Sequence, residues 1–141
     1  MPTAQKTVAL RSKLEKVWKF LSDVENIGEA LGVVEQTTLE EGKSRRSLKS
    51  PFSIVTQTKT LDVVLTKAEE EKKVSWKAEG DHLTIEGKCS LESRNDETIC
   101  DIVLTFEPKG ALSPILKPMM EMNIGSRLQV FVNSLKERLE S

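Results

Sequence analysis

The chain has 141 residues, of which 38% are hydrophobic and 30% are charged, and its formal net charge at pH 7 is -1. This length suits one domain with a sizeable core, so we expect a single domain over residues 1–141. The near-neutral charge gives no reason to expect a nucleic-acid partner, because such partners require a basic surface. The sequence contains no uncharged apolar run near the ~20 residues of a membrane span and no apolar signal core, so the expected compartment is cytoplasmic.

The first elements predicted along the chain are a strand and two short helices. The stretch TVAL (residues 7–10) predicts the strand. Ser12 and Glu15 form an S-x-x-E capping box, which predicts that a helix starts there. The same spacing recurs from Ser22, which predicts a second short helix ending near Gly32. The apolar residues at helical spacing in the first helix are Leu14, Val17, Trp18 and Leu21.

From Val33 to Pro108 the pattern predicts strands. β-Branched residues dominate this region, and turn-forming breaks divide it into six segments. The breaks are EEGKS, SPF, AEEEKK, EGDH and SRNDE. Short turns between consecutive strands favour antiparallel pairing, so together with the first strand the chain is predicted to form a seven-stranded antiparallel sheet.

Each of the last three predicted strands carries apolar residues on one face. Successive side chains of a strand point to opposite faces, so residues two apart lie together. The opposite parity is mostly charged or hydroxylated, which predicts a sheet covered on one face and solvated on the other. The apolar sets are Val74, Trp76 and Ala78, then Leu83, Ile85, Cys89 and Leu91, and last Cys100, Ile102, Leu104 and Phe106.

A long helix is predicted at the end of the chain. Ser113 followed by Pro114 favours a helix start, and Pro118 marks either a kink or the true start. From Pro118 onward the helix would span roughly 35 Å, enough to cross a curved sheet on its concave side. Its apolar stripe comprises Leu116, Met120, Ile124, Leu128, Phe131, Leu135 and Leu139.

The element order resembles that of the START-like (SRPBCC, helix-grip) superfamily over nearly the whole chain. The segments that carry the resemblance are LEKVWKFLSDVENIGEAL, KVSWKAEG, TICDIVLTFEPKG and LQVFVNSLKERLE. VWKFLSD and EPKGALSPIL are most similar to the CoxG-like branch, which is associated with carbon monoxide dehydrogenase, and to its polyketide cyclase-like relatives.

The resemblance implies an α+β fold of the helix-grip (START/Bet v 1-like) type. In that fold a curved seven-stranded antiparallel sheet has two short helices after its first strand and a long C-terminal helix across its concave face. The cavity between them binds lipids, sterols, polyketides, quinones or other apolar molecules. The closer branch implies a role beside a partner redox enzyme.

We predict an apolar cavity in this chain as well, because a straight helix over a curved sheet leaves space that the side chains cannot fill everywhere. The chain has no tyrosine and only four phenylalanines, so bulky residues are scarce. The expected volume is on the order of several hundred Å³. The predicted cavity wall consists of Trp76, Ile85, Ile102, Leu104, Phe106, Leu116, Met120, Ile124 and Leu128.

Candidates for chemistry are few. The single histidine, His82, falls in a predicted turn, and the inner faces of the last three strands carry no acid or base. We therefore expect no catalytic residues, no metal site and no cofactor. Thr56, Thr58 and Thr60 are either ordinary strand residues or pocket hydroxyls. Met119, Met120 and Met122 either fill the core or form a pliable cavity wall.

The two cysteines, Cys89 and Cys100, have no metal-site spacing. A turn centred on Arg94 and Asn95 would place them directly opposite each other, and a shift by one residue would leave them diagonal. An apolar face and a reducing compartment favour two buried free thiols.

The leading hypothesis is therefore a non-catalytic protein that binds an apolar small molecule or lipid. The alternatives are an enzyme of the polyketide cyclase or dehydratase type, and an accessory protein that acts through its surface without a ligand.

Overall fold

The computed structural model describes residues 3–30, 34–40, 43–48 and 60–140, and for β2 and β3 it describes the backbone. The elements in chain order are β1 (Thr3–Leu10), α1 (Leu14–Leu21), α2 (Val24–Ala30), β2 (Val34–Glu40), β3 (Lys43–Leu48), β4 (Thr60–Glu69), β5 (Lys73–Glu79), β6 (Leu83–Arg94), β7 (Glu97–Pro108), the 3-10 helix η1 (Gly110–Leu112) and α4 (Ser113–Leu139).

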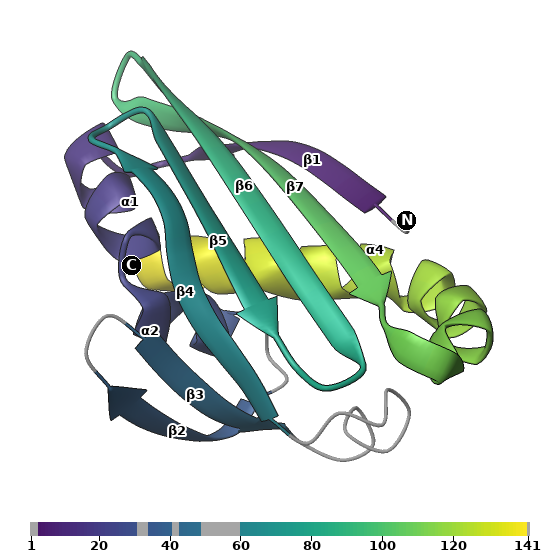
Figure 1. Cartoon of the computed structure of the whole chain (residues 1–141). Helices are drawn as coiled ribbons and strands as arrows, with labels where there is room; N and C mark the ends of the chain where they lie inside the picture. Colours follow the sequence, from purple (N-terminus) through teal and green to yellow (C-terminus); the bar gives the residue numbers. More distant parts are fainter. Residues whose placement is uncertain (1–2, 31–33, 41–42, 49–59, 141) are drawn as a thin grey trace.

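The strands form one antiparallel sheet in the order β1-β7-β6-β5-β4-β3-β2. From β2 to β7 each strand pairs with the next along the chain, as short turns favour. β1 forms the edge opposite β2 and pairs with β7, so the first and last strands along the chain lie side by side (Figure 1). An α+β fold with an antiparallel sheet and a C-terminal helix is thus confirmed.

The long helix α4 runs across one face of the sheet (Figure 1) and contacts β1, β7 and α2. It begins at Ser113 and contains Pro118, so the proline lies inside the helix and does not start it. In Figure 1 the first turns run at an angle to the rest, and an internal proline is an ordinary cause of such a bend. The buried stripe of α4 comprises Leu116, Met120, Ile124, Leu128, Phe131, Val132, Leu135 and Leu139.

The two short helices lie at one end of this face, where α1 contacts β5, β6 and β7, and α2 contacts α4 and β4. The predicted capping box at Ser12 is wrong: the N-cap of α1 is Lys13, and no side chain caps it. Ser12 instead lies just after β1, where its backbone carbonyl accepts a hydrogen bond from Thr98 Oγ1 at 2.8 Å. The second predicted cap is displaced by one residue, because Asp23 Oδ1 accepts the backbone N–H of Glu25 at 2.9 Å.

The predicted inner faces of β5, β6 and β7 are buried from Val74 to Phe106, except that Leu91 is half-buried. The opposite face is not wholly solvated, however, because Ser75 and Thr84 are also buried. Both are small hydroxyl residues paired with long charged residues on the neighbouring strands. The aliphatic stems of such neighbours cover small side chains without burying their own charges.

Strand and helix pack tightly at Trp76, which is 1% exposed. Trp76 pairs directly with Gly87 of β6, and its ring stacks on Phe131 of α4 with centroids 6.2 Å apart. A Cβ added at Gly87 would fall 2.6 Å from Trp76 Nε1 and closer still to the ring carbons Cε2 and Cζ2. Gly87 is therefore required for the indole to lie over β6.

We predict that Gly87→Ala destabilises the fold by about 1–3 kcal/mol, because the added methyl group overpacks the indole against Phe131. Gly125→Ala is the matched control: nothing lies within 4 Å of a Cβ added there, and helix propensity should stabilise that variant by about 0.5–1 kcal/mol. Urea unfolding of both variants measures the difference. Equal stability of Gly87→Ala and the parent would show that the indole does not occupy this position.

Candidate functional site

The nine residues predicted to wall a cavity lie together in one buried apolar cluster between the sheet and α4. Their exposed fractions range from 0% for Ile102 and Leu104 to 5% for Ile124. The strands β5, β6 and β7 supply five of them and α4 supplies four. The structure thus brings together every predicted wall residue. Their contact with a ligand stays a prediction.

Two buried indole nitrogens have no hydrogen-bond partner among the described residues, Trp76 Nε1 and Trp18 Nε1. Burying an N–H without an acceptor costs about 1–3 kcal/mol, so such groups are uncommon in folded proteins. Trp18, on the short helix α1, is only half-buried, whereas Trp76 is a fully buried member of the core. Trp76 is therefore the polar group of interest within the apolar cluster.

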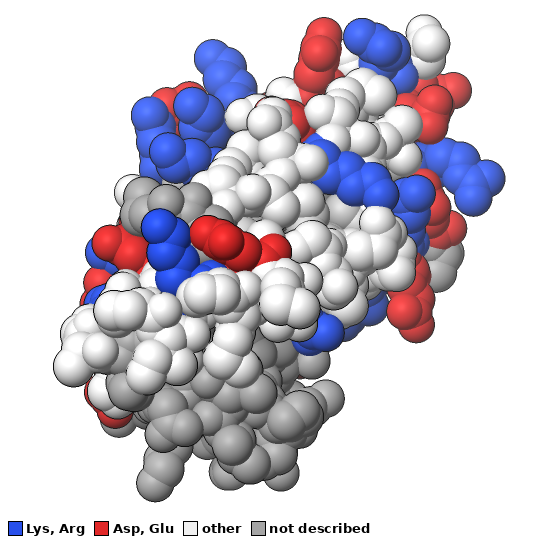
Figure 2. Space-filling model, turned by 90° about the vertical axis from the view of Figure 1, so that its right-hand side faces the viewer, with Lys and Arg blue, Asp and Glu red and all other residues white. Residues whose placement is uncertain are grey.

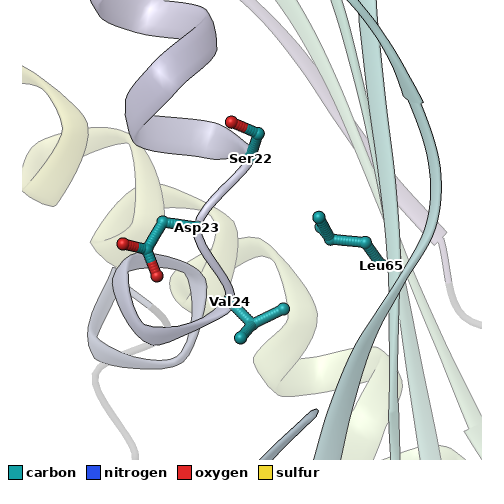
Figure 3. A pocket seen from close by; sticks show the side chains of 4 residues that line it. All are labelled: Ser22, Asp23, Val24 and Leu65. Atoms are coloured by element: carbon teal, nitrogen blue, oxygen red, sulfur yellow. The ribbon is translucent and has the colours of Figure 1, made fainter. Parts of the chain in front are cut away.

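A pocket of about 390 Å³ opens between the α1–α2 junction and β4, lined by Ser22, Asp23, Val24 and Leu65. Figure 3 shows the side chains of Val24 and Leu65 directed across the gap, whereas the Asp23 carboxylate is turned toward α2, which it caps. Leu65 pairs directly with Trp76 on β5, so both project from the same face of the sheet. The pocket therefore lies beside the apolar cluster.

This pocket was not predicted from the sequence. Its residues belong to a helix junction and to a strand far along the chain, and no local pattern joins them. The role of Gly87 was also missed, although a glycine inside a strand pattern is a recognised sign of a close approach by another group. Of the three candidate threonines, Thr56 and Thr58 lie outside the described residues, and for Thr60 only the backbone is described.

Apart from the two thiols, no titratable side chain lies on the inner faces of β5, β6 and β7, all of which the structure describes. His82 is half-buried in the turn that connects β5 to β6. Its backbone carbonyl accepts a hydrogen bond from the N–H of Lys109 at 2.9 Å. Asp101 lies on the outer face, where it accepts hydrogen bonds from Gln5 at 3.1 Å and Thr7 at 3.0 Å. Within residues 3–30 and 60–140, no group of three His, Cys, Asp or Glu side chains is placed to hold a metal ion.

The two thiols, Cys89 and Cys100, are buried and free, as predicted. They lie diagonally, because Cys89 is opposite Ile102 and Cys100 is opposite Leu91. The turn is thus shifted by one residue from the arrangement that pairs them directly, and Asn95 takes the left-handed conformation in it (φ 56°). A hydrogen bond with Cys100, followed by burial, raises the pKa of the Cys89 thiol well above its ordinary value.

We predict that neither thiol reacts with Ellman's reagent in the folded protein at about pH 8, near the ordinary thiol pKa. The unfolded chain loses the Cys89 proton at the ordinary pKa, while the folded chain keeps it to higher pH. The unfolded state then binds fewer protons, so the free energy of unfolding should fall as the pH rises above ~8.5. Cys89→Ala should show a shallower fall. Rapid labelling of the native protein, or equal slopes, would contradict this.

The first half of α4 exposes apolar side chains. Ile115 is 64% exposed and Met122 is 82% exposed, whereas Met120 is buried. Core filling is therefore wrong for Met122, and its place in a cavity wall stays a prediction. Figure 2 shows the side of the molecule on which α4 begins: a broad area without charged side chains lies between groups of basic and acidic residues.

A family model described as polyketide cyclase / dehydrase and lipid transport matches residues 1–140. No curated protein matches the sequence. Within the described ranges, no helix is long and apolar enough to cross a membrane.

Several solved structures share the fold. A conserved protein from Geobacillus kaustophilus has a TM-score of 0.76 at 16% identity, over 98% of this chain and 95% of that one. A START superfamily protein from Mycobacterium smegmatis has a TM-score of 0.71 at 18% identity, over 98% and 97%. A protein from Thermus thermophilus has a TM-score of 0.68 at 17% identity, over 98% and 97%. At these identities the TM-scores show likeness of fold alone.

Proposed function

The chain belongs to the polyketide cyclase / dehydrase and lipid transport family, and we propose that it binds an apolar small molecule or lipid between its sheet and α4. The observation that carries the proposal is the buried cluster itself, which contains nine apolar residues from three strands and one helix. The pocket beside Leu65 gives this cluster a neighbouring opening. Apolar surfaces with few polar groups are typical of small-molecule sites.

Binding fits the described residues better than catalysis does. A cyclase or dehydratase moves protons, which requires an acid or base within reach of the substrate. The described inner faces of β5, β6 and β7 offer instead two thiols, one of them with a raised pKa, and an indole N–H. These groups orient a molecule without transferring protons near neutral pH.

A role beside a redox enzyme forms a further part of the proposal, and it rests on the resemblance of VWKFLSD and EPKGALSPIL to the CoxG-like branch. A cytoplasmic location is proposed with it. Native mass spectrometry of the purified protein, followed by solvent extraction, tests the main proposal directly. An extracted apolar compound that adds its mass to the native protein supports binding, and conversion of that compound by the protein would favour the enzyme instead.

Filling the predicted cavity should abolish binding. We predict that Ile102→Trp, at the centre of the cluster, takes up the neutral apolar dye N-phenyl-1-naphthylamine at least about tenfold more weakly than the parent, because the new ring occupies ligand space. In the parent the dye should raise the melting temperature through linkage. Dye fluorescence and thermal melts measure both effects.

The matched control is Val103→Trp, which adds the same ring to the next residue of β7, on the outer face. It should bind the dye as the parent does. Ile102→Phe is the smaller step if the tryptophan variant does not fold. A folded Ile102 variant that binds as tightly as the parent places the ligand elsewhere, and a parent that binds no apolar probe contradicts the function.

A further inference from the structure

The position of the Trp76 side chain is determined from three sides. Gly87 on β6 lies against the indole, Phe131 of α4 stacks on it, and Leu65 is its direct partner on β4. The indole is 1% exposed. It cannot turn away over Gly87 or toward α4 without displacing backbone or a buried ring, so its N–H direction is a fixed property of the fold.

The side chains around Trp76 supply no acceptor for this N–H. Its direct partners are Gly87 and Leu65, and its neighbours on the same face of β5 are Val74 and Ala78. The aromatic ring of Phe131 lies beyond. All of these are apolar, and Nε1 has no hydrogen-bond partner in the described part of the chain. The fold therefore maintains a buried donor without an acceptor, which is unfavourable.

We propose that the N–H of Trp76 donates a hydrogen bond to an oxygen of the bound molecule, and that this molecule is a neutral apolar compound with an accepting oxygen, such as a ketone, quinone or ester. This inference rests on the proposed function and specifies its ligand class. A pure hydrocarbon would leave the N–H unpaired. A carboxylate would bring a negative charge to faces of β5, β6 and β7 that offer no cation, at a large desolvation cost.

The site should select ligands with an accepting oxygen, because it offers one hydrogen-bond donor that is surrounded by apolar side chains. An oxygen that accepts the N–H removes the cost of the unpaired group, whereas an analogue without that oxygen does not. Two probes of the same shape therefore separate the hydrogen bond from apolar burial. Fluorenone and fluorene form such a pair, since fluorenone has a carbonyl group where fluorene has a methylene group.

The test compares both probes in the parent and in Trp76→Phe, which keeps an aromatic ring but has no N–H. Calorimetry should give a ratio of the two dissociation constants that favours fluorenone by about three- to tenfold more in the parent than in Trp76→Phe. Trp18→Phe is the matched control: it removes the other unpaired indole N–H, and it should leave the parent ratio unchanged.

A second measurement does not depend on the stability of Trp76→Phe. The chain has two tryptophans, so Trp18→Phe leaves a single indole signal in a ¹⁵N–¹H spectrum. That signal should move downfield when fluorenone binds and move less when fluorene binds. If both probes bind, but the ratio of their dissociation constants is the same in the parent and in Trp76→Phe and both probes shift the indole signal equally, the hydrogen bond is refuted and the binding function stands. If neither probe binds, the proposed function itself fails.

Discussion

The contact of Trp76 with Gly87 below and Phe131 above is the constraint on which the arrangement of sheet and helix depends. The missing side chain at Gly87 lets a large ring lie across β6, and the ring in turn gives α4 an aromatic surface to pack against at 6.2 Å. The buried stripe of α4 then extends this contact in both directions along the helix. Burial of that stripe stabilises the fold by roughly 1.5–3 kcal/mol for each large side chain.

The two ends of α4 are held differently. At the C-terminal end, Glu140 accepts the backbone N–H of Arg11 at 2.8 Å, and Arg138 pairs with Glu29 at 3.2 Å while lying 5.6 Å from the ring of Phe20. These contacts join the helix end to β1, α1 and α2. Such exposed ion pairs contribute little stability singly, but they orient the helix end. The first half of α4 instead presents Ile115 and Met122 to solvent.

The chemistry of the interior follows from this packing. A sheet face of alternating apolar residues under an apolar helix stripe excludes water and leaves few polar atoms inside. Each polar atom that remains has a large effect, because an unpaired donor in an apolar surround is costly. A hydrogen bond with Cys100 and burial raise the pKa of the Cys89 thiol, and Thr98 donates a hydrogen bond to the Ser12 carbonyl. The N–H of Trp76 stays unpaired among the described residues, as do Trp18 Nε1 and the Ser12 hydroxyl.

The sequence by itself determined the faces. A period of two in the strands and a helical stripe in α4 depend on which neighbouring residues are apolar, and most of the buried hydrophobic residues from Val74 to Leu139 follow that pattern. The tertiary structure decided what depends on distant partners. Ser12 does not cap α1, and its carbonyl accepts a hydrogen bond from Thr98, a residue far along the chain. The β6–β7 register, with a left-handed Asn95 in its turn, leaves the cysteines diagonal. The opening beside Leu65 exists only because α1, α2 and β4 meet in space. Local periodicity carries no information on any of these, because a side-chain hydrogen bond, a strand register and a pocket are each set by residues far apart in the chain.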